Sequence, residues 1–563
     1  MGLFLLDYGA GNVQSLANTL ARLGHDFRWI SSAQDFDTAT SLIFPGVGAF
    51  QTAVDGLASR GFIEPLRAYI ASGRPYFGIC IGMQILFQSS AEGEAAGLGL
   101  IPSPIDRFSD VDKSVPHMGW NSVDFLDTDH KSNEGMDEAS HYYFVHSYRA
   151  AYDPDGRPEA AQWVHSVTQY GQEVFVATVR KGNVFGSQFH PEKSGAAGLK
   201  LLDAWLHESE FERTHAAPTP RISRPPKPKD TFTKRIVACM DVRANDQGDL
   251  VVTKGDQYDV REKPSTPNPT DPSLAISAAG AVRNLGKPVA LAERYFAEGA
   301  DEIALLNITS FRHSPLHDQP MLAVVRAAAQ KIFVPLTIGG GIRDTYDPDG
   351  TRRSALEVAG AYFRAGADKV SIGSEAVHAV ERMRAAGGRG DGTSAIETIA
   401  HAYGRQAVVV SIDPKRTYVD LPYDGPHRGE VVFGLEDGPE QERGRAWWYQ
   451  CTVSGGRELR DLSVVELAQG VEALGAGEIL LNSIDRDGTG LGFDLDLVRL
   501  VRRSVKVPVV ASSGAGRAEH FAEVFEEAEV EAALAAGIFH RKEVGIAEVK
   551  KTLLEAGINV RGL

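Results

Sequence analysis

Gly78-Ile79-Cys80-Ile81-Gly82 follows the apolar run Tyr76-Phe77 and continues into Met83-Gln84-Ile85-Leu86-Phe87. This order predicts a strand, a sharp turn and then a helix. A Gly-x-Cys-x-Gly turn leaves the sulfur at the tip of a tight bend, where only glycine tolerates the neighbouring backbone. Because a helix N-terminus favours thiolate over thiol, we interpret Cys80 as a nucleophile rather than as a small core residue.

A thiolate nucleophile needs a base, and Gln188-Phe189-His190-Pro191-Glu192 supplies one. Glu192 lies two residues beyond His190, a spacing that lets the carboxylate orient the imidazole. Read alone, His-Pro-Glu is also typical of a surface turn. A third motif, Pro45-Gly46-Val47-Gly48, follows the apolar run Leu42-Ile43, and its amides can turn toward a developing oxyanion.

Together these motifs resemble the class I (triad) glutamine amidotransferases. The resemblance implies a catalytic triad of Cys80, His190 and Glu192, and it implies that oxyanion and glutamine contacts come from Gly46, Val47, Gly48 and Gln84. Such a domain hydrolyses glutamine and passes ammonia to a synthase. Three further motifs are similar to the glutaminase part of imidazole glycerol phosphate synthases: Tyr8-Gly9-Ala10-Gly11-Asn12, Pro116-His117-Met118-Gly119-Trp120-Asn121 and Tyr142-Tyr143-Phe144-Val145-His146-Ser147-Tyr148. His146 lacks a carboxylate two residues on, so we expect a packed histidine there.

Composition limits the remaining choices. The 563 residues are 43% apolar, which favours two domains with sizeable cores. A net charge of -16 argues against nucleic acid as a partner. Three cysteines suit a reducing compartment, and no apolar run approaches a membrane span. We expect a cytoplasmic monomer, with a plastid location left open if a leader was trimmed.

The chain divides into three parts. Residues 1–212 alternate short apolar runs with helical patterns, which predicts an α/β domain with a mostly parallel open sheet. Residues 213–233 carry five prolines and predict a semi-rigid linker. Residues 234–563 contain an internal repeat with an offset of about 175 residues. Each half supplies four strands; the third strand of the first half is predicted to begin at Val334, and the fourth strands are predicted at residues 369–372 and 532–535. Two such half-barrels predict a (β/α)8 barrel.

The repeat also predicts where the chemistry of the barrel lies, because catalytic residues of such barrels follow the strand ends. Asp241 closes strand 1 and Asp413 closes strand 5, which places an acid/base pair on opposite sides of the mouth. Glycine-rich turns after strands 3 and 4, and after strands 6 to 8, predict two phosphate cradles. The residues assigned to them are Gly341, Gly373, Ser374, Asp487, Gly488, Gly514, Ala536 and Gly537. Two cradles suggest a long ligand with a phosphate at each end.

Several barrel motifs resemble the cyclase part of the imidazole glycerol phosphate synthase family, and with the first domain the chain is similar to the fused bifunctional form of fungi and plants. These motifs are Ala238-Cys239-Met240-Asp241-Val242-Arg243, Val251-Val252-Thr253-Lys254-Gly255, Thr337-Ile338-Gly339-Gly340-Gly341-Ile342-Arg343, Ser483-Ile484-Asp485-Arg486-Asp487-Gly488-Thr489 and Ala511-Ser512-Ser513-Gly514-Ala515-Gly516. The resemblance implies that phosphoribulosyl-formimino-AICAR phosphate, a bisphosphorylated ribonucleotide, is the substrate and that Lys254 contacts it. It implies no metal and no organic cofactor.

Four charged residues begin strands 1, 2, 4 and 6: Arg235, Glu302, Lys369 and Glu478. Charged strand starts are commonly solvated, but the resemblance implies a gate over an ammonia passage along the barrel axis. We expect the two sites to communicate allosterically, with Pro45-Gly46-Val47-Gly48 as the switch.

Two features leave alternatives open. The loop after strand 1 runs from Val242 through a proline-rich piece (Pro264, Pro267, Pro269 and Pro272), and the loop after strand 5 runs from Pro414 to about Tyr449. Both exceed ordinary βα loops, and they are either lids or inert insertions. A phosphosugar aldose-ketose isomerase would share the repeat and both aspartates but would not need a glutaminase. A regulatory metabolite-binding protein with a degraded glutaminase is opposed by the intact triad.

Overall fold

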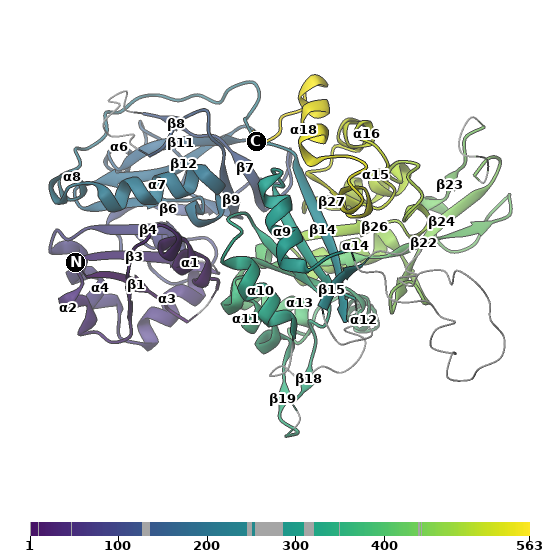
Figure 1. Cartoon of the computed structure of the whole chain (residues 1–563), viewed down its shortest axis with the longest axis horizontal. Helices are drawn as coiled ribbons and strands as arrows, with labels where there is room; N and C mark the ends of the chain where they lie inside the picture. Colours follow the sequence, from purple (N-terminus) through teal and green to yellow (C-terminus); the bar gives the residue numbers. More distant parts are fainter. Residues whose placement is uncertain are drawn as a thin grey trace.

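The structure is a computed structural model that describes residues 2–9, 11–46, 48–126, 135–244, 250–253, 285–308, 320–347, 349–436, 440 and 442–562. Figure 1 shows an N-terminal α/β domain beside a C-terminal barrel, with β7 (His117–Asn121) and β9 (Tyr142–His146) at the junction. No helix among these residues is long and apolar enough to cross a membrane.

The first domain is built on one eight-stranded sheet. In spatial order its strands are β2 (Arg28–Ile30), β1 (Leu3–Leu6), β3 (Ser41–Gly46), β4 (Tyr76–Cys80), β13 (Val184–Ser187), β12 (Glu173–Lys181), β11 (Val164–Tyr170) and β8 (Asp124–Phe125). The pairs from β2 to β13 are parallel, and those from β13 to β8 are antiparallel. The predicted mostly parallel open sheet is therefore confirmed.

Alternating side chains of β1 enter two separate cores, because successive residues of a strand point to opposite faces. Leu3 and Leu5 pack on the side of α1 and α7, whereas Phe4 and Leu6 pack on the side of α3 and α4. The helices of this domain are α1 (Gln14–Arg22), α2 (Asp35–Thr38), α3 (Phe50–Ser59), α4 (Ile63–Ala71), α5 (Ile81–Gln84), α6 (Pro158–Ala161), α7 (Gly195–His207) and α8 (Glu210–Thr214), with a 3-10 turn η2 at Pro191–Lys193. A small sheet is formed by β5 (Phe87–Ser90), β6 (Ile101–Arg107) and β10 (Tyr148–Arg149).

The second domain is a closed barrel of eight parallel strands, as the repeat predicted. The strands are β14 (Arg235–Ala244), β16 (Glu302–Asn307), β17 (Leu336–Gly339), β20 (Lys369–Ile372), β21 (Val408–Ile412), β26 (Glu478–Asn482), β27 (Val509–Ser512) and β28 (Ala532–Ala535). Pairing of β28 with β14 closes the ring.

Helices surround the barrel. They are α9 (Pro288–Ala297), α10 (Pro320–Ala329), α11 (Ala355–Ala365), α12 (Ser374–Ala385), α13 (Ala395–Tyr403), α14 (Val464–Leu474), α15 (Leu495–Ser504), α16 (Glu519–Glu527), α17 (Gly537–His540) and α18 (Ile546–Glu555). Three of them begin with a Ser-x-x-Glu capping box, at Ser354, Ser394 and Ser463. In each box the serine and the glutamate satisfy backbone N–H groups that the helix leaves unpaired.

The segment after strand 5 corrects the expectation of a simple long loop. Four strands of the segment 414–463, which we call the β-arm, form an antiparallel sheet: β22 (Pro414–Val419), β23 (Val432–Phe433), β24 (Ala446–Val453) and β25 (Glu458–Ser463). It extends well past Tyr449 and projects from the barrel (Figure 1).

After strand 1, β15 (Leu250–Thr253) pairs antiparallel with the end of β14. A short hairpin, β18 (Thr345–Tyr346) with β19 (Arg352–Arg353), follows strand 3.

The linker lies against the first domain instead of spanning open space. Residues 217–233 form no helix or strand, yet Lys227 N donates to Gln169 Oε1 at 2.7 Å and Gly171 N donates to an Asp230 carboxylate oxygen at 2.7 Å. These contacts fix the path of the chain into β14.

The domains meet where the barrel strands begin. Asp368, which directly precedes β20, pairs with Lys193 Nζ at 2.7 Å and accepts from Asn12 Nδ2 at 2.8 Å. Trp120 Nε1 donates to the carbonyl of Asp301, which directly precedes β16, at 3.1 Å. The N-terminal face of the barrel is therefore covered by the first domain.

Candidate active sites

Cys80 occupies a strained turn that its glycine neighbours make feasible. Its φ is +51°, a backbone conformation that residues other than glycine rarely adopt. A Cβ on Gly78 would lie 2.2 Å from the Gly82 carbonyl oxygen, and one on Gly82 would lie 2.0 Å from that of Phe44. Such strain is typical of functional positions, and here it places the buried Cys80 side chain at the last residue of β4.

The helix after Cys80 is shorter than predicted. Helix α5 ends at Gln84, and Phe87 already lies in strand β5. Because a single helical turn has only a small dipole, it contributes less to thiolate stabilisation than the expected longer helix.

His190 and Glu192 lie as their spacing predicted. His190 Nδ1 and Glu192 Oε1 are 2.8 Å apart, and both side chains are buried. Burial alone would lower the pKa of His190, but the Glu192 and Cys80 charges outweigh it and raise that pKa well above its ordinary value. This environment favours the imidazolium form of His190. His146 is packed, as expected: its Nδ1 donates to the Tyr148 carbonyl at 2.7 Å.

The predicted oxyanion strand lies next to the nucleophile. Gly46 pairs in register with Cys80, and Gly48 lines the same pocket as Cys80 and His190. Gly48 has a φ of +145°, and a Cβ there would lie 3.0 Å from the Tyr8 hydroxyl. Val47 lies outside the described residues. Gln84 lies deeper, with Nε2 donating to Gln188 Oε1 at 3.0 Å, and Gln188 Nε2 lies 3.5 Å from Cys80 Sγ.

Sequence reasoning missed Glu92. Its Oε2 accepts from Phe50 N at 2.7 Å, and burial raises its pKa to about 7. Tyr8 connects it to the thiolate: burial raises the pKa of Tyr8, and the Cys80 and Glu92 charges raise it further. A carboxylate near Tyr8 can bind a substrate ammonium. Glu92 and Glu94 lie in a Gly- and Ala-rich segment, and no motif there distinguishes Glu92.

The Cys80 pocket reaches the barrel. Gly48, Cys80 and His190 line one side, and Asp368, Lys369 and Gln406 at the base of the barrel line the other. A single pocket thus joins Cys80 to Lys369, one of the four charged strand starts.

These four residues form a closed ring, and all are buried. Arg235 pairs with Glu302 (Nη1–Oε2, 2.6 Å) and with Glu478. Lys369 Nζ pairs with the same carboxylates at 2.7 and 2.6 Å. Thr337, which was not predicted, donates from Oγ1 to Glu302 at 2.6 Å. Burial would raise the pKa of Glu302, but Lys369 and Arg235 lower it, which favours the ionised carboxylate of Glu302.

Beyond the ring a cluster of apolar side chains lines part of the barrel interior. Alternate strand residues point inward, and they include Val237, Cys239, Ala304, Val409, Leu480, Val510 and Leu534. Asp241 lies on the same face of β14 as the inward-pointing Val237 and Cys239. Asp413 directly follows β21, at a position that shares the inward face with Val409. Strands β14 and β21 stand first and fifth in the ring, hence on opposite sides. Asp413 Oδ1 accepts from Asn482 Nδ2 at 2.8 Å, and burial raises its pKa.

The second predicted cradle is a pocket at the mouth. Its lining combines loops after β26, β27 and β28, and it contains Asp487, Gly488, Gly514, Ala536 and Gly537. Arg541, which sequence reasoning did not select, also lines it.

The first cradle is positioned by neighbouring strands. Because β17 pairs with β20, the turn with Gly341 at φ +77° begins beside Gly373, the N-cap of α12. Ser374 Oγ accepts from Ser454 N of the β-arm at 3.0 Å. Lys254 lies outside the described residues.

The β-arm joins the second cradle through buried Arg416. Its guanidinium pairs with Glu442 at 2.7 Å and with Asp494 at 2.8 Å, and its backbone N–H donates to Asp485 Oδ2 at 2.8 Å. Glu442 also pairs with Arg486 at 2.8 Å. Asp485 and Arg486 directly precede Asp487, so this network holds the loop that lines the phosphate pocket.

Comparison with known proteins agrees with the division into two domains. Residues 4–208 match the family "Glutamine amidotransferase class-I", and residues 235–545 match "Histidine biosynthesis protein". The fold and site thus define a glutamine amidotransferase domain fused to a histidine-biosynthesis barrel.

Full-length relatives refine this class. The chain is 51% identical over 562 residues to "Imidazole glycerol phosphate synthase hisHF" of Emericella nidulans, covering 99% of this chain and 98% of the relative. It is equally identical to the Schizosaccharomyces pombe protein of that name, with 99% of each covered. The subunit HisF of Methanopyrus kandleri is 39% identical over 330 residues, which cover 59% of this chain and 98% of the subunit. The chain belongs to the imidazole glycerol phosphate synthase family.

Proposed function

We propose that this chain is a glutamine-dependent imidazole glycerol phosphate synthase. It hydrolyses glutamine in the first domain and uses the ammonia in the barrel, where phosphoribulosyl-formimino-AICAR phosphate is converted to imidazole glycerol phosphate and AICAR. The observation that carries the proposal is the shared pocket, in which Cys80 and His190 face Lys369 of the charged ring. A glutaminase whose pocket opens onto the base of a barrel has a direct route for its product.

In the first half-reaction Cys80 attacks the glutamine amide. His190 transfers the proton to the leaving ammonia, Glu192 orients the imidazole, and backbone amides at Gly46 to Gly48 hold the oxyanion. The thioester is then hydrolysed to glutamate. Gln84 supports Gln188 beside the sulfur.

In the second half-reaction ammonia crosses the ring of Arg235, Glu302, Lys369 and Glu478. The apolar interior keeps it unprotonated and nucleophilic, since a charged ammonium would be poorly solvated there. Asp241 and Asp413 then exchange protons during addition, cleavage and ring closure. Burial raises the pKa of Asp413, and a raised pKa suits the role of general acid. Asp241 is then the general base. The two cradles bind the terminal phosphates, and Lys254 contacts the substrate.

Both catalytic domains act within one chain, and we propose that it functions as a monomer. All three cysteines are free and buried, which suits a reducing compartment such as the cytoplasm. One relative of 51% identity, from Arabidopsis thaliana, is named as chloroplastic, so a plastid is the second candidate.

The decisive assay measures glutamate release with and without the bisphosphorylated ribonucleotide. We expect low basal release and at least about tenfold stimulation, which corresponds to coupling of about 1 to 3 kcal/mol. An isomerase would convert the ribonucleotide without consuming glutamine. A regulatory protein would bind it without turnover.

Glu92→Gln should lower kcat/KM for glutamine by about tenfold or more, because the ammonium of glutamine loses its anionic partner. A carboxyl group is ionised above its pKa, so with a pKa of about 7 the wild-type kcat/KM should rise as pH increases through 7. This rise of kcat/KM with pH should disappear in Glu92→Gln. It should persist in Glu94→Gln, because Glu94 is an exposed neighbour. An unchanged pH profile in Glu92→Gln would exclude this role.

Arg416→Met should raise KM for the ribonucleotide by about tenfold in ammonia-dependent synthesis, because the loop before Asp487 loses its buried anchor. Basal glutaminase activity should be unchanged, and Arg416→Lys should restore part of the KM effect. Arg445→Met, at an exposed arginine of the same β-arm, is the matched control. A loss confined to kcat would contradict a positioning role.

A further inference from the structure

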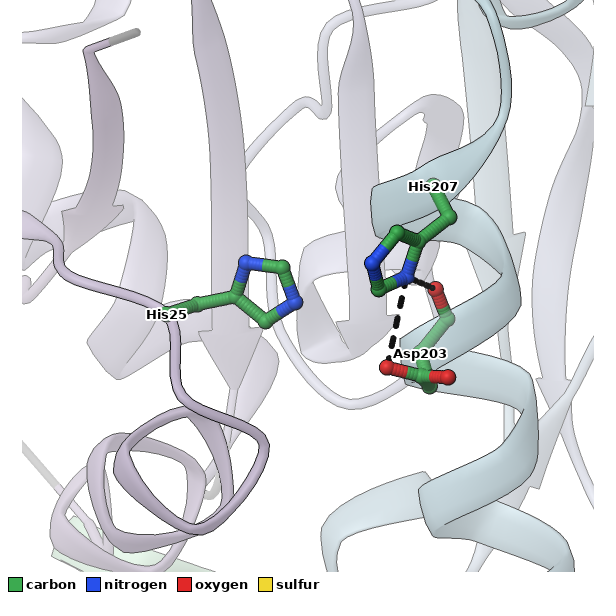
Figure 2. Close-up of side chains that lie close together, drawn as sticks. All are labelled: His25, Asp203 and His207. Atoms are coloured by element: carbon green, nitrogen blue, oxygen red, sulfur yellow. Dashed lines mark hydrogen bonds and ion pairs between the residues drawn. The ribbon is translucent and has the colours of Figure 1, made fainter.

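A group of metal-ligating side chains lies away from both active sites. His25 follows α1, and Asp203 and His207 lie on the last turns of α7 (Figure 2). One ligand atom from each of the three lies within 4.8 Å of the others. The two imidazoles face each other across a gap, with the Asp203 carboxylate beside it. Within the described part of the chain, this is the one such group.

His25 is held in place by the end of α1. Gly24 adopts a φ of +81° and turns the chain, and His25 N donates to the Leu20 carbonyl at 2.9 Å. This turn fixes the backbone from which the imidazole projects. His25 Nε2 is buried and has no hydrogen-bond partner within the described structure. A buried ring nitrogen without a partner is unusual and indicates a missing ligand.

His207 is oriented as metal-ligating histidines are. It lies four residues after Asp203, so both side chains share one face of α7. Its Nδ1 donates to the Asp203 carbonyl at 2.8 Å, which fixes the tautomer and leaves Nε2 as a ligand. His207 Nδ1 also lies 3.3 Å from Asp203 Oδ1, and because the two side chains are 66% and 48% exposed, both have room to rotate.

We propose that His25, Asp203 and His207 bind a divalent cation of the Zn²⁺ or Co²⁺ type. Two imidazoles and one carboxylate favour such ions over Mg²⁺ and Ca²⁺, which prefer oxygen ligands. Three protein ligands leave a fourth tetrahedral position for water. With metal–ligand bonds of about 2.0–2.2 Å, the ligand atoms of a tetrahedral site stand about 3.4 Å apart. Here they lie within 4.8 Å of one another, and rotation of the exposed His207 and Asp203 side chains can bring them to the shorter separation.

The site is structural and not part of the glutaminase reaction. Helix α7 has 13 residues and begins just after the His190 turn, so its far end lies about 20 Å away. Metal bound there ties the turn after α1 to the end of α7, the two helices that cover one face of the sheet. An ion that binds only the folded domain stabilises it.

The test is a Co²⁺ titration of the full chain carrying Cys80→Ser, which removes the catalytic thiol as a competing ligand. We expect one equivalent to bind with the visible absorption of a nitrogen- and oxygen-ligated ion. His25→Ala and His207→Ala in this background should each weaken binding by at least about tenfold, and Asp203→Asn should weaken it less. His215 is an exposed histidine directly after α8, so His215→Ala should bind Co²⁺ as the parent does.

Thermal unfolding gives a second readout. Saturating Zn²⁺ should raise the Tm of the parent by a few degrees and leave that of His25→Ala unchanged. The proposal is overturned if no saturable absorption develops up to about 1 mM Co²⁺. It is also overturned if the signal persists in the His25→Ala/His207→Ala double variant.

Discussion

Cys80→Ala is expected to abolish glutamine-dependent synthesis and to leave synthesis from added ammonium salts intact at high pH. The sulfur is the group that accepts the acyl carbon, so glutamine hydrolysis should fall by several orders of magnitude. The barrel does not need the thiol when ammonia comes from solution. Both activities are measured as imidazole glycerol phosphate formation from the same ribonucleotide.

Cys451→Ala is the matched control, because Cys451 is also buried and free but lies in the β-arm of the barrel. It should retain glutamine-dependent synthesis. If Cys80→Ala loses both activities together while remaining folded, Cys80 is a structural residue and the nucleophile lies elsewhere.

Asp413→Asn should reduce cyclisation by about 10²- to 10⁴-fold with either nitrogen source, since an amide of similar shape cannot exchange a proton. Asp241→Asn should have a loss of the same order. Basal glutaminase activity should persist in both variants, because neither residue contacts the Cys80 pocket. A loss below about tenfold at either position would remove that residue from the mechanism.

The internal repeat predicted the barrel closely because it fixes strand order independently of local propensity. Strands β20 and β28 begin and end at the predicted residues, 369–372 and 532–535. Strand β17 was predicted to begin at Val334 but begins at Leu336. Pro335 explains the shift, because it has no N–H for the parallel ladder.

The residues that sequence reasoning missed depend on partners far along the chain. Thr337 acts through Glu302, and Arg416 acts through Asp494, which lies 78 residues away. Neither pair has a spacing that a motif can reveal. The β-arm was taken for a loop because ordinary connections after barrel strands are short, and its pairing of β22 with β24 is apparent only in three dimensions.

The triad, in contrast, was accessible because its chemistry is local. Cys80 needs glycines on both sides to adopt its φ of +51°, and His190 is oriented by a carboxylate two residues away. Both requirements involve residues only two positions apart in the sequence, so a short motif can reveal them. Glu92 has no such local companion, and only the folded chain brings it near Tyr8.

The central claim is that ammonia passes from Cys80 to the barrel mouth inside the molecule. It is tested by synthesis at neutral pH from glutamine labelled with ¹⁵N in the side-chain amide, in an excess of unlabelled ammonium. Mass spectrometry of imidazole glycerol phosphate then reports the source of the new nitrogen. We predict that nearly all product carries ¹⁵N, whereas a label content equal to that of the bulk ammonium pool would contradict an internal passage.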